Sequence, residues 1–370
     1  MKKRIVELDI IKGLCIIFMV IGHTSWKYMN ILLLFHMAVF FMVSGYLFQE
    51  NNADSFKSIW LFTVKRLKQL YIPWVIAQSV YMLLNNLFLW IGFYTSDPAF
   101  LTDTLVKHNF GIVERMNFSG FIIDELKILL MQGGTQFGGS LWFLRSLLLV
   151  ELMFAAITYL GNKSRKTFLV PILVLVLFAL GRLLAYTTFG KFDILRIEAL
   201  QVCIPISAYY MGWLARKYKD KLTCAYKWWG GVLAFCVLFI LLEIDVHIDM
   251  SNGTMTNSLF YLFATLSGFV LCMSISKLII KVVFLMQIFS FIGRNTLPIL
   301  ILHLVVFKSV TAIQIFIYEN SMSLPEYALA SFPTLLSTGV WPYIYTIVGV
   351  AIPLGLNTIY KRKKSRIINK

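Results

Sequence analysis

The stretch that decides the fold runs from Glu7 to Tyr46 and reads ELDIIKGLCIIFMVIGHTSWKYMNILLLFHMAVFFMVSGY. It is almost continuously apolar, and it holds two segments of about 20 residues, near 8–28 and 31–49, that are each long enough to cross a bilayer. These segments predict two transmembrane helices that run in opposite directions. The first segment lacks a small-residue cleavage site and holds a lysine, so we expect it to remain in the mature protein rather than act as a signal peptide.

Three ionisable side chains lie inside this apolar stretch. Eleven positions separate Lys12 from His23, which is about three turns of helix, so both side chains point the same way, ~16 Å apart along the helix axis. His36 lies about as far past the connection as His23 lies before it, which predicts a similar depth. Ionisable groups in hydrocarbon are costly and usually functional. We therefore expect the chemistry near these residues, with histidine suited to move a proton near neutral pH.

The composition is that of a polytopic membrane protein. Of the 370 residues, 59% are hydrophobic and only 14% are charged, and the mean hydropathy is +0.76. The net charge of +16 would suit nucleic acid, but the basic residues form short clusters between apolar runs, so we expect no nucleic-acid partner and instead a lipid bilayer. The five cysteines show no framework spacing, and we expect neither disulfides nor a metal site.

Eight further apolar segments bring the predicted number of transmembrane helices to ten. They lie near 71–92, 140–160, 167–187, 196–214, 228–247, 256–276, 296–318 and 334–359. Of the 34 lysines and arginines, 24 fall on one predicted face of the membrane and 5 on the other, the five being Lys27, Lys107, Arg115, Lys127 and Lys191. The positive-inside rule therefore predicts that both termini are cytoplasmic. The fold class we expect is an all-α polytopic membrane helical bundle, formed by residues 1–370 as a single domain.

A basic cluster and several embedded polar residues are further candidates for function. Lys65, Arg66 and Lys68 are predicted on the same inner side as Lys12, where they would suit a phosphate-rich ligand. The alternative is that they only obey the positive-inside rule and that Lys12 reaches the inner interface with its long side chain. An acidic neighbour such as Asp9 or Glu7 would pair with Lys12.

Arg145 and Glu151 are also embedded in an apolar segment. They are six residues apart, so they do not share a helical face, and each needs a partner on another helix. For these two residues, and for His303 in the ninth predicted helix, interhelical pairing and a functional role both remain open.

Several short motifs in this order resemble acyltransferase family 3, integral-membrane enzymes that O-acylate sugars and cell-surface polymers. The resemblance covers nearly the whole chain. Its motifs are Asp9-Ile10-Ile11-Lys12-Gly13 with His23, Phe35-His36 with Phe40-Phe41 and Ser44-Gly45-Tyr46, Lys65-Arg66 before Tyr71-Ile72-Pro73-Trp74, Leu141-Trp142-Phe143-Leu144, and Gly293-Arg294-Asn295-Thr296 leading to His303. The chain departs from the family at Lys12, where arginine is commoner, and at Leu300, where tyrosine is frequent, and it shows no appended hydrolase-like domain.

The resemblance implies a membrane O-acyltransferase that uses acetyl-CoA or another acyl-CoA as its co-substrate. The acceptor would be a hydroxyl of an extracytoplasmic or lipid-linked glycan, and the location would be the plasma membrane, as a multi-pass protein of a bacterial inner membrane. His23 would act as the general base or as a transient acyl carrier, and His36 would orient it or share the proton.

The remaining site residues are implied in the same way. Those implied to bind the donor are Lys12, Lys65, Arg66, Lys68, Trp142 and Arg145, and those implied to support the site are Asp9, Ser44 and His303. The main alternative is a proton-coupled transporter or flippase of a sugar or small solute, in which the histidines would form a proton relay.

Overall fold

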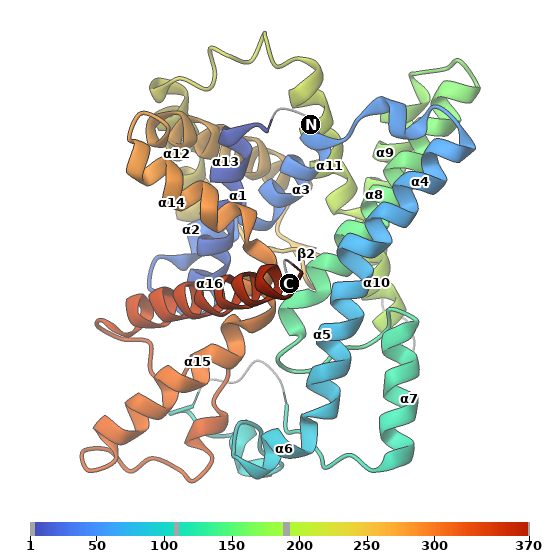
Figure 1. The fold of residues 1–370 in the computed structure, drawn as a ribbon. Helices are drawn as coiled ribbons and strands as arrows, with labels where there is room; N and C mark the ends of the chain where they lie inside the picture. Colours follow the sequence, from blue (N-terminus) through green and yellow to red (C-terminus); the bar gives the residue numbers. More distant parts are fainter. Residues whose placement is uncertain (1–3, 107–110, 188–192, 369–370) are drawn as a thin grey trace. The chain divides into compact units, whose positions relative to one another are not determined.

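The computed structural model describes residues 4–106, 111–187 and 193–368, and its regular secondary structure is almost entirely helical (Figure 1). The only strands in these ranges are β1 (Ile248–Asp249) and β2 (Thr254–Met255), which pair antiparallel in a small hairpin. The all-α class predicted from the apolar segments is therefore confirmed. Five basic residues that contribute to the predicted orientation lie outside the described residues, namely Lys2, Lys3, Lys107, Lys191 and Lys370.

Five segments of the described chain are long and apolar enough to cross a membrane. They are Met29–Leu47, Gly139–Lys163, Ser258–Ile279, Thr296–Tyr318 and Trp341–Arg366. Three further helices are apolar but shorter, at Leu169–Ala185, Trp228–Glu243 and Val283–Arg294. The structure thus provides membrane-spanning helices by length and composition, and the count of ten remains a prediction.

The helices fall into two compact units, each built from several separate parts of the chain. The first unit comprises Met1–Cys15, Asn30–Trp74 and Trp142–Arg294. Its helices are α2 (Met29–Leu33), α3 (His36–Leu47), α4 (Phe56–Arg66), α8 (Trp142–Lys163), α9 (Leu169–Ala185), α10 (Asp193–Cys203), α11 (Pro205–Lys217), α12 (Trp228–Glu243), α13 (Ser258–Ile279) and α14 (Val283–Arg294). It also holds a 3-10 turn at Glu50–Ala53 and a π-helical segment at Leu67–Tyr71.

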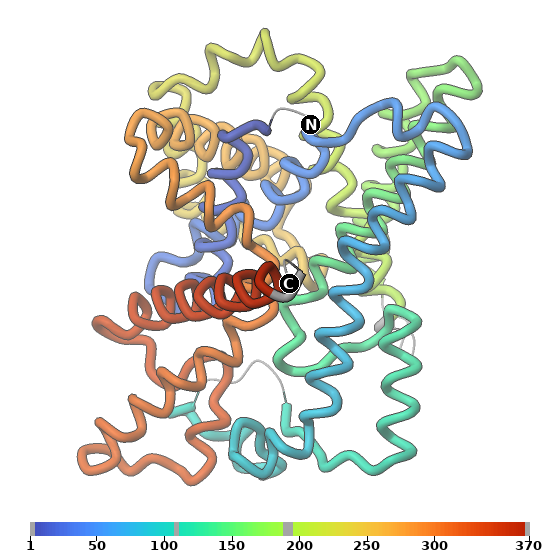
Figure 2. The backbone as a smooth tube through the Cα atoms, viewed as in Figure 1, coloured from blue at the N-terminus to red at the C-terminus, as the bar shows by residue number. Residues whose placement is uncertain are grey.

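The second unit comprises Ile16–Met29, Val75–Leu141 and Asn295–Lys370. Its helices are α5 (Ile72–Leu83), α6 (Asn85–Trp90), α7 (Phe118–Leu129), α15 (Thr296–Tyr318) and α16 (Trp341–Ile368). Helices α15 and α16 pack against each other, and the tube in Figure 2 follows them from orange to red. Helix α1 (Val6–Gly22) contributes its first half to the first unit and its second half to the second.

Helix α1 is shorter than the predicted segment 8–28. Glu7 and Asp9 in its first turn complement the positive end of the helix dipole. The helix ends at Gly22, and Ser25 just beyond it has a φ of 53°, a left-handed conformation that turns the chain away from the helix axis. As a result, His23 lies in the turn that follows α1 rather than within the helix.

Among the other predicted segments that the structure divides or shortens, two change at proline or glycine. The segment 196–214 forms two helices, because Pro205 lacks a backbone N–H and begins α11 instead of continuing α10. The last segment was predicted from residue 334, whereas α16 begins at Trp341. Pro333 and Gly339, which has a φ of 59°, lie in the non-helical chain before it.

Glycines allow the helices of the first unit to approach closely. A Cβ atom on Gly45 of α3 would lie 1.9 Å from the carbonyl oxygen of Tyr209 on α11, and one on Gly212 would lie 1.9 Å from that of Met42. A Cβ on Gly13 of α1 would likewise lie 2.4 Å from the carbonyl oxygen of Phe289 on α14. Small residues at such crossings are typical of membrane helix packing, and the last one holds the part of α1 that carries Lys12.

Candidate active site

Two histidines meet in the second unit. His23, in the turn after α1, and His303, on α15, have ring centroids 5.2 Å apart with the ring planes inclined at 39°. His303 is fully buried, and His23 is partly exposed. A buried histidine beside an accessible one is an arrangement through which a proton can pass between a substrate and the protein.

The hydrogen bonds of His303 determine its tautomer. Its Nδ1 lies 2.9 Å from the carbonyl oxygen of Ile299, and because a carbonyl oxygen only accepts, Nδ1 carries the proton. In the neutral ring the lone pair is then on Nε2. This atom is buried and has no hydrogen-bond partner among the described residues. Nε2 of His303 is therefore the ring nitrogen that carries a lone pair without a hydrogen-bond partner among the described residues.

The turn of α15 that precedes His303 is held by side chains from other segments. Ser140 Oγ donates a hydrogen bond to the carbonyl oxygen of Leu300, and Tyr81 OH donates one to that of Ile301. The glycine-rich run before Ser140 is itself closed around Gln78, whose amide accepts from the Thr135 N–H and donates to the Gly138 carbonyl oxygen. These contacts determine where α15 presents the His303 ring.

His36 lies in the first unit, as the first residue of α3. It is 5% exposed, and its Nδ1 lies 2.8 Å from the Leu32 carbonyl oxygen, so this nitrogen also carries a proton. The ring contact that the structure gives His23 is with His303, which the sequence assigned only a supporting role. A joint role of His23 and His36 remains a prediction.

Two of the basic residues expected to bind the donor, Lys12 and Arg66, form ion pairs with carboxylates. Lys12 Nζ lies 2.7 Å from Asp9 Oδ1, as predicted, with the two side chains 27% and 13% exposed. Arg66, the last residue of α4, lies 2.7 Å from Glu151 on α8, whose side chain is only 1% exposed. Lys65 and Lys68, by contrast, are exposed.

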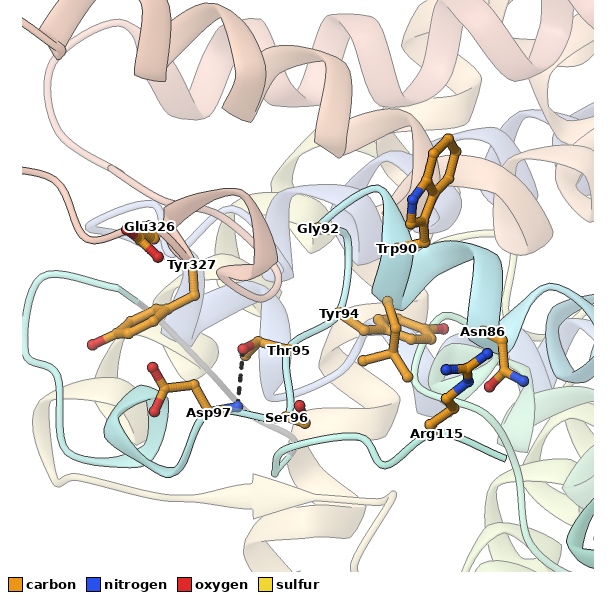
Figure 3. A pocket seen from close by; sticks show the side chains of 11 residues that line it. Asn86, Trp90, Gly92, Tyr94, Thr95, Ser96, Asp97, Arg115, Glu326 and Tyr327 are labelled. Carbon is orange, nitrogen blue, oxygen red and sulfur yellow. Dashed lines mark hydrogen bonds between the residues drawn. The ribbon is translucent and has the colours of Figure 1, made fainter. Parts of the chain in front are cut away.

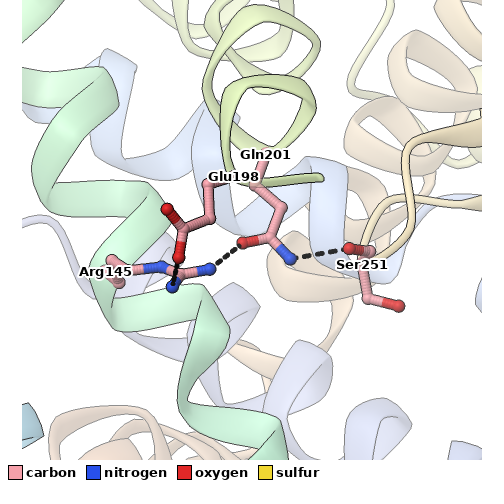
Figure 4. A network of polar contacts seen from close by, with 4 residues as sticks. All are labelled: Arg145, Glu198, Gln201 and Ser251. Atoms are coloured by element: carbon pink, nitrogen blue, oxygen red, sulfur yellow. Dashed lines mark hydrogen bonds and ion pairs between the residues drawn. The ribbon is translucent and has the colours of Figure 1, made fainter. Parts of the chain in front are cut away.

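Arg145 is the centre of a polar network in the first unit (Figure 4). Its guanidinium reaches from α8 to α10, where Nη1 lies 2.7 Å from Glu198 Oε1 and Nη2 donates to Gln201 Oε1 at 2.6 Å. Gln201 in turn donates to the carbonyl oxygen of Ser251, beside the β-hairpin. The prediction that Arg145 and Glu151 each need a partner on another helix is confirmed. Trp142 and Ser44, the other expected residues of this unit, are partly exposed.

An open groove of about 600 Å³ in the second unit was not predicted from the sequence. Figure 3 shows Asn86, Trp90 and Arg115 at one end, and Asp97, Glu326 and Tyr327 at the other. Aromatic faces next to amide, carboxylate and guanidinium groups are chemically suited to a polyhydroxylated ligand. The local run of Trp90, Tyr94 and polar residues up to Asp97 was the available signal, but the opposite wall comes from a part of the chain more than 200 residues away.

The tyrosine at the acidic end of this groove keeps its proton. Partial burial, together with the nearby carboxylates of Asp103 and Asp97, raises the pKa of the Tyr327 hydroxyl. Tyr327 accordingly donates a hydrogen bond of 2.9 Å to Asp103 Oδ2.

Within the described ranges, no group of three or more His, Cys, Asp or Glu side chains could hold a metal ion.

The comparisons with known proteins point to one family. The family model of acyltransferase family 3, described as an acyltransferase domain, matches residues 5–349. No match was found among curated proteins or among solved structures.

The ion pair of Arg66 and Glu151 provides a stability test. Replacing Arg66 by methionine leaves the buried Glu151 carboxylate without its cation, and we expect the free energy of unfolding to fall by about 3–5 kcal/mol. Replacing Glu151 by methionine should cost less, because the Arg66 side chain is 22% exposed and also donates to Gln69 Oε1. The double variant removes both charges and should recover most of the loss. Unfolding of the detergent-purified protein by denaturant would measure this. Single variants as stable as the wild type, with a raised KM for the acyl donor, would instead mean that Arg66 is a ligand-binding residue.

Proposed function

The chain belongs to acyltransferase family 3 and is a membrane acyltransferase, and we propose that it moves an acetyl group from acetyl-CoA to a hydroxyl of a glycan. The observation that supports a site for this reaction is the contact of His23 with His303, whose buried Nε2 atom has no partner among the described residues. The glycan would be extracytoplasmic or linked to a lipid.

The reaction needs a base and a route for one proton. His23, the more accessible ring, takes the proton of the acceptor hydroxyl as its oxygen bonds to the thioester carbonyl carbon. The carbon–sulfur bond then breaks, and the proton passes to the CoA sulfur that leaves. In the variant of this scheme in which His23 first carries the acetyl group, a ring nitrogen of His23 bonds to the thioester carbonyl carbon, the carbon–sulfur bond breaks, and CoA leaves with the proton of the ring. The acceptor hydroxyl then attacks the acetyl-histidine, and its proton returns to the His23 ring. His303 shares the proton through Nε2 in either case, and His36 has an orienting role.

The donor and acceptor are bound by different groups of residues in this proposal. The exposed Lys65 and Lys68 and the partly exposed Lys12 are available to phosphate groups of the donor. Arg66 and Arg145, which have carboxylate partners, act by holding α4, α8 and α10 together. Trp142 and Ser44 line the donor path, and the groove between Trp90 and Tyr327 receives the acceptor glycan.

The proposed topology has ten membrane-spanning segments with both termini in the cytoplasm. Helices α1, α9 and α12 are apolar but have only 16 to 17 residues, so they would span with help from the residues that flank them. The protein would be a multi-pass protein of the bacterial inner membrane. Acetyl-CoA would enter from the cytoplasm, and the acceptor would reach the groove from outside.

Acetyl-CoA consumption by the purified protein tests the function. We expect the wild type to release CoA in the presence of a glycan acceptor, and His23→Ala to lower the rate by about 10²–10⁴-fold, because a general base typically contributes that much. His36→Ala is the matched comparison and should lower the rate less. A wild-type rate in His23→Ala would overturn the assignment of the base. A wild type that neither binds nor consumes acetyl-CoA would favour the transporter alternative.

Labelling from one side of the membrane tests the topology. In a variant without the five native cysteines, Ser96→Cys in the groove and Ser365→Cys near the C-terminal end of α16 introduce single thiols. A membrane-impermeant maleimide added to intact spheroplasts should label position 96 only, and position 365 should react after permeabilisation. Labelling of both positions from outside would contradict the proposed topology, which places an odd number of crossings between residue 96 and the cytoplasmic C-terminal tail.

A further inference from the structure

A second cavity lies in the first unit, at the end of α11. It has a volume of about 440 Å³, and its wall comes from the chain that follows α3 and from the last turn of α11. The residues that line it are Phe48, Gln49, Glu50, Asn51, Trp213, Arg216 and Lys217. It therefore combines two cations, the carboxylate of Glu50, an indole ring and two amide side chains.

The two cations of this cavity have no carboxylate within ion-pair distance in the part of the chain that the structure describes. Arg216 Nη1 donates to the carbonyl oxygens of Tyr46 and Phe48 at 3.2 and 3.4 Å, which holds the guanidinium against the wall. Lys217 Nζ lies 4.9 Å from the centre of the Trp213 ring. Both positive charges therefore remain available to an anion, in contrast to that of Arg66, which is paired with the buried Glu151.

The indole of Trp213 is held from behind by other aromatic rings. It stacks on Tyr210 with ring centroids 5.7 Å apart and planes inclined at 20°. The ring centroid of Phe154 lies 6.1 Å from that of Trp213. Trp213 is itself partly exposed and lines the cavity. A supported aromatic face next to cations suits a ligand that combines a flat heterocycle with phosphate groups.

We propose that this cavity binds the nucleotide end of acyl-CoA. This inference rests on the proposed function, because it supplies a place for the adenosine and phosphates of the same donor. The adenine takes the place of the Lys217 ammonium over the Trp213 ring as that ammonium moves to a phosphate. The adenine amino group donates to the carboxylate of Glu50 or the amide oxygen of Asn51. Arg216 and Lys217 contact the phosphates as charge-assisted donors. The phosphate of a lipid headgroup has the same anionic chemistry but lacks the heterocycle, and the experiment must separate the two.

Donors with and without the nucleotide separate binding at this cavity from the chemical step. Acetyl-CoA and acetyl-pantetheine share the thioester and the pantetheine arm, but only the former carries adenosine and phosphates. We expect Trp213→Ala and Lys217→Glu each to raise the KM for acetyl-CoA roughly tenfold or more, as for the loss of one charge-assisted or stacking contact, with kcat unchanged. The KM for acetyl-pantetheine should stay the same.

Lys219→Glu is the matched control, because Lys219 is exposed in the same basic segment but does not line the cavity. The inference would be overturned if Lys217→Glu and Lys219→Glu raised the KM for acetyl-CoA equally, or if Lys217→Glu raised the KM for acetyl-CoA and for acetyl-pantetheine equally. The acyltransferase function would stand in both cases. A lipid phosphate in the cavity would give effects on both donors that depend on phosphatidylglycerol in the vesicles, and this also overturns it.

Binding of adenosine 3′,5′-bisphosphate keeps the cavity testable without catalysis. If the wild type consumes neither donor, the proposed function fails, and calorimetry with this nucleotide then examines the cavity by itself. We expect binding to the wild type and to Lys219→Glu, and at least tenfold weaker binding to Lys217→Glu and Trp213→Ala. Equal affinities for all four proteins would contradict a nucleotide site at the end of α11.

Discussion

The hydrogen bond from His303 Nδ1 to the carbonyl oxygen of Ile299 determines which ring nitrogen keeps a lone pair, and the chemistry proposed for this protein depends on it. The bond joins a side chain to its own helix, so it persists only while α15 keeps its conformation and position. Ser140 and Tyr81 secure the same turn through the next two carbonyl oxygens. Gln78 secures the glycine-rich run that carries Ser140. The structural elements around the site thus hold one ring nitrogen with an unpartnered lone pair, Nε2 of His303, in the ring that contacts His23.

Desolvation explains how the other charges of the chain are used. A buried charge is costly unless it is paired and hydrogen-bonded, and Arg145 with Glu198 and Arg66 with Glu151 meet this condition by linking separate helices of the first unit. Lys308 meets it in the second unit by donating to the carbonyl oxygens of Leu329 and Ser331. Such groups stabilise the fold. The cations that remain for a ligand are therefore those near the surface, and this distinction is the reason for assigning the donor nucleotide to the end of α11.

Much of the fold could be predicted from the sequence, because long apolar runs leave the backbone no alternative to helix in a membrane. The sequence also predicted that Arg145 and Glu151 need partners on other helices, because residues six positions apart do not share a helical face. The partners themselves could not be predicted, and neither could the contact of His23 with His303, because these residues are far apart in the chain and meet only through packing. The two cavities could not be predicted for the same reason: Trp90 and Tyr327 line the groove, and Phe48 and Trp213 line the second cavity, from distant parts of the chain. The breaks before Pro205 and Trp341 could have been read from proline and glycine within apolar runs.

The most direct test of the central claim is the rate of CoA release by His303→Asn at saturating acetyl-CoA, with a glycan acceptor present. The asparagine amide can donate a hydrogen bond to Ile299 as Nδ1 does, so we expect a folded protein whose thermal stability is close to that of the wild type. It has no counterpart of Nε2, so the account predicts a rate lower by at least about 10²-fold. A stable His303→Asn protein that releases CoA at the wild-type rate would contradict the claim that this atom takes part in proton transfer.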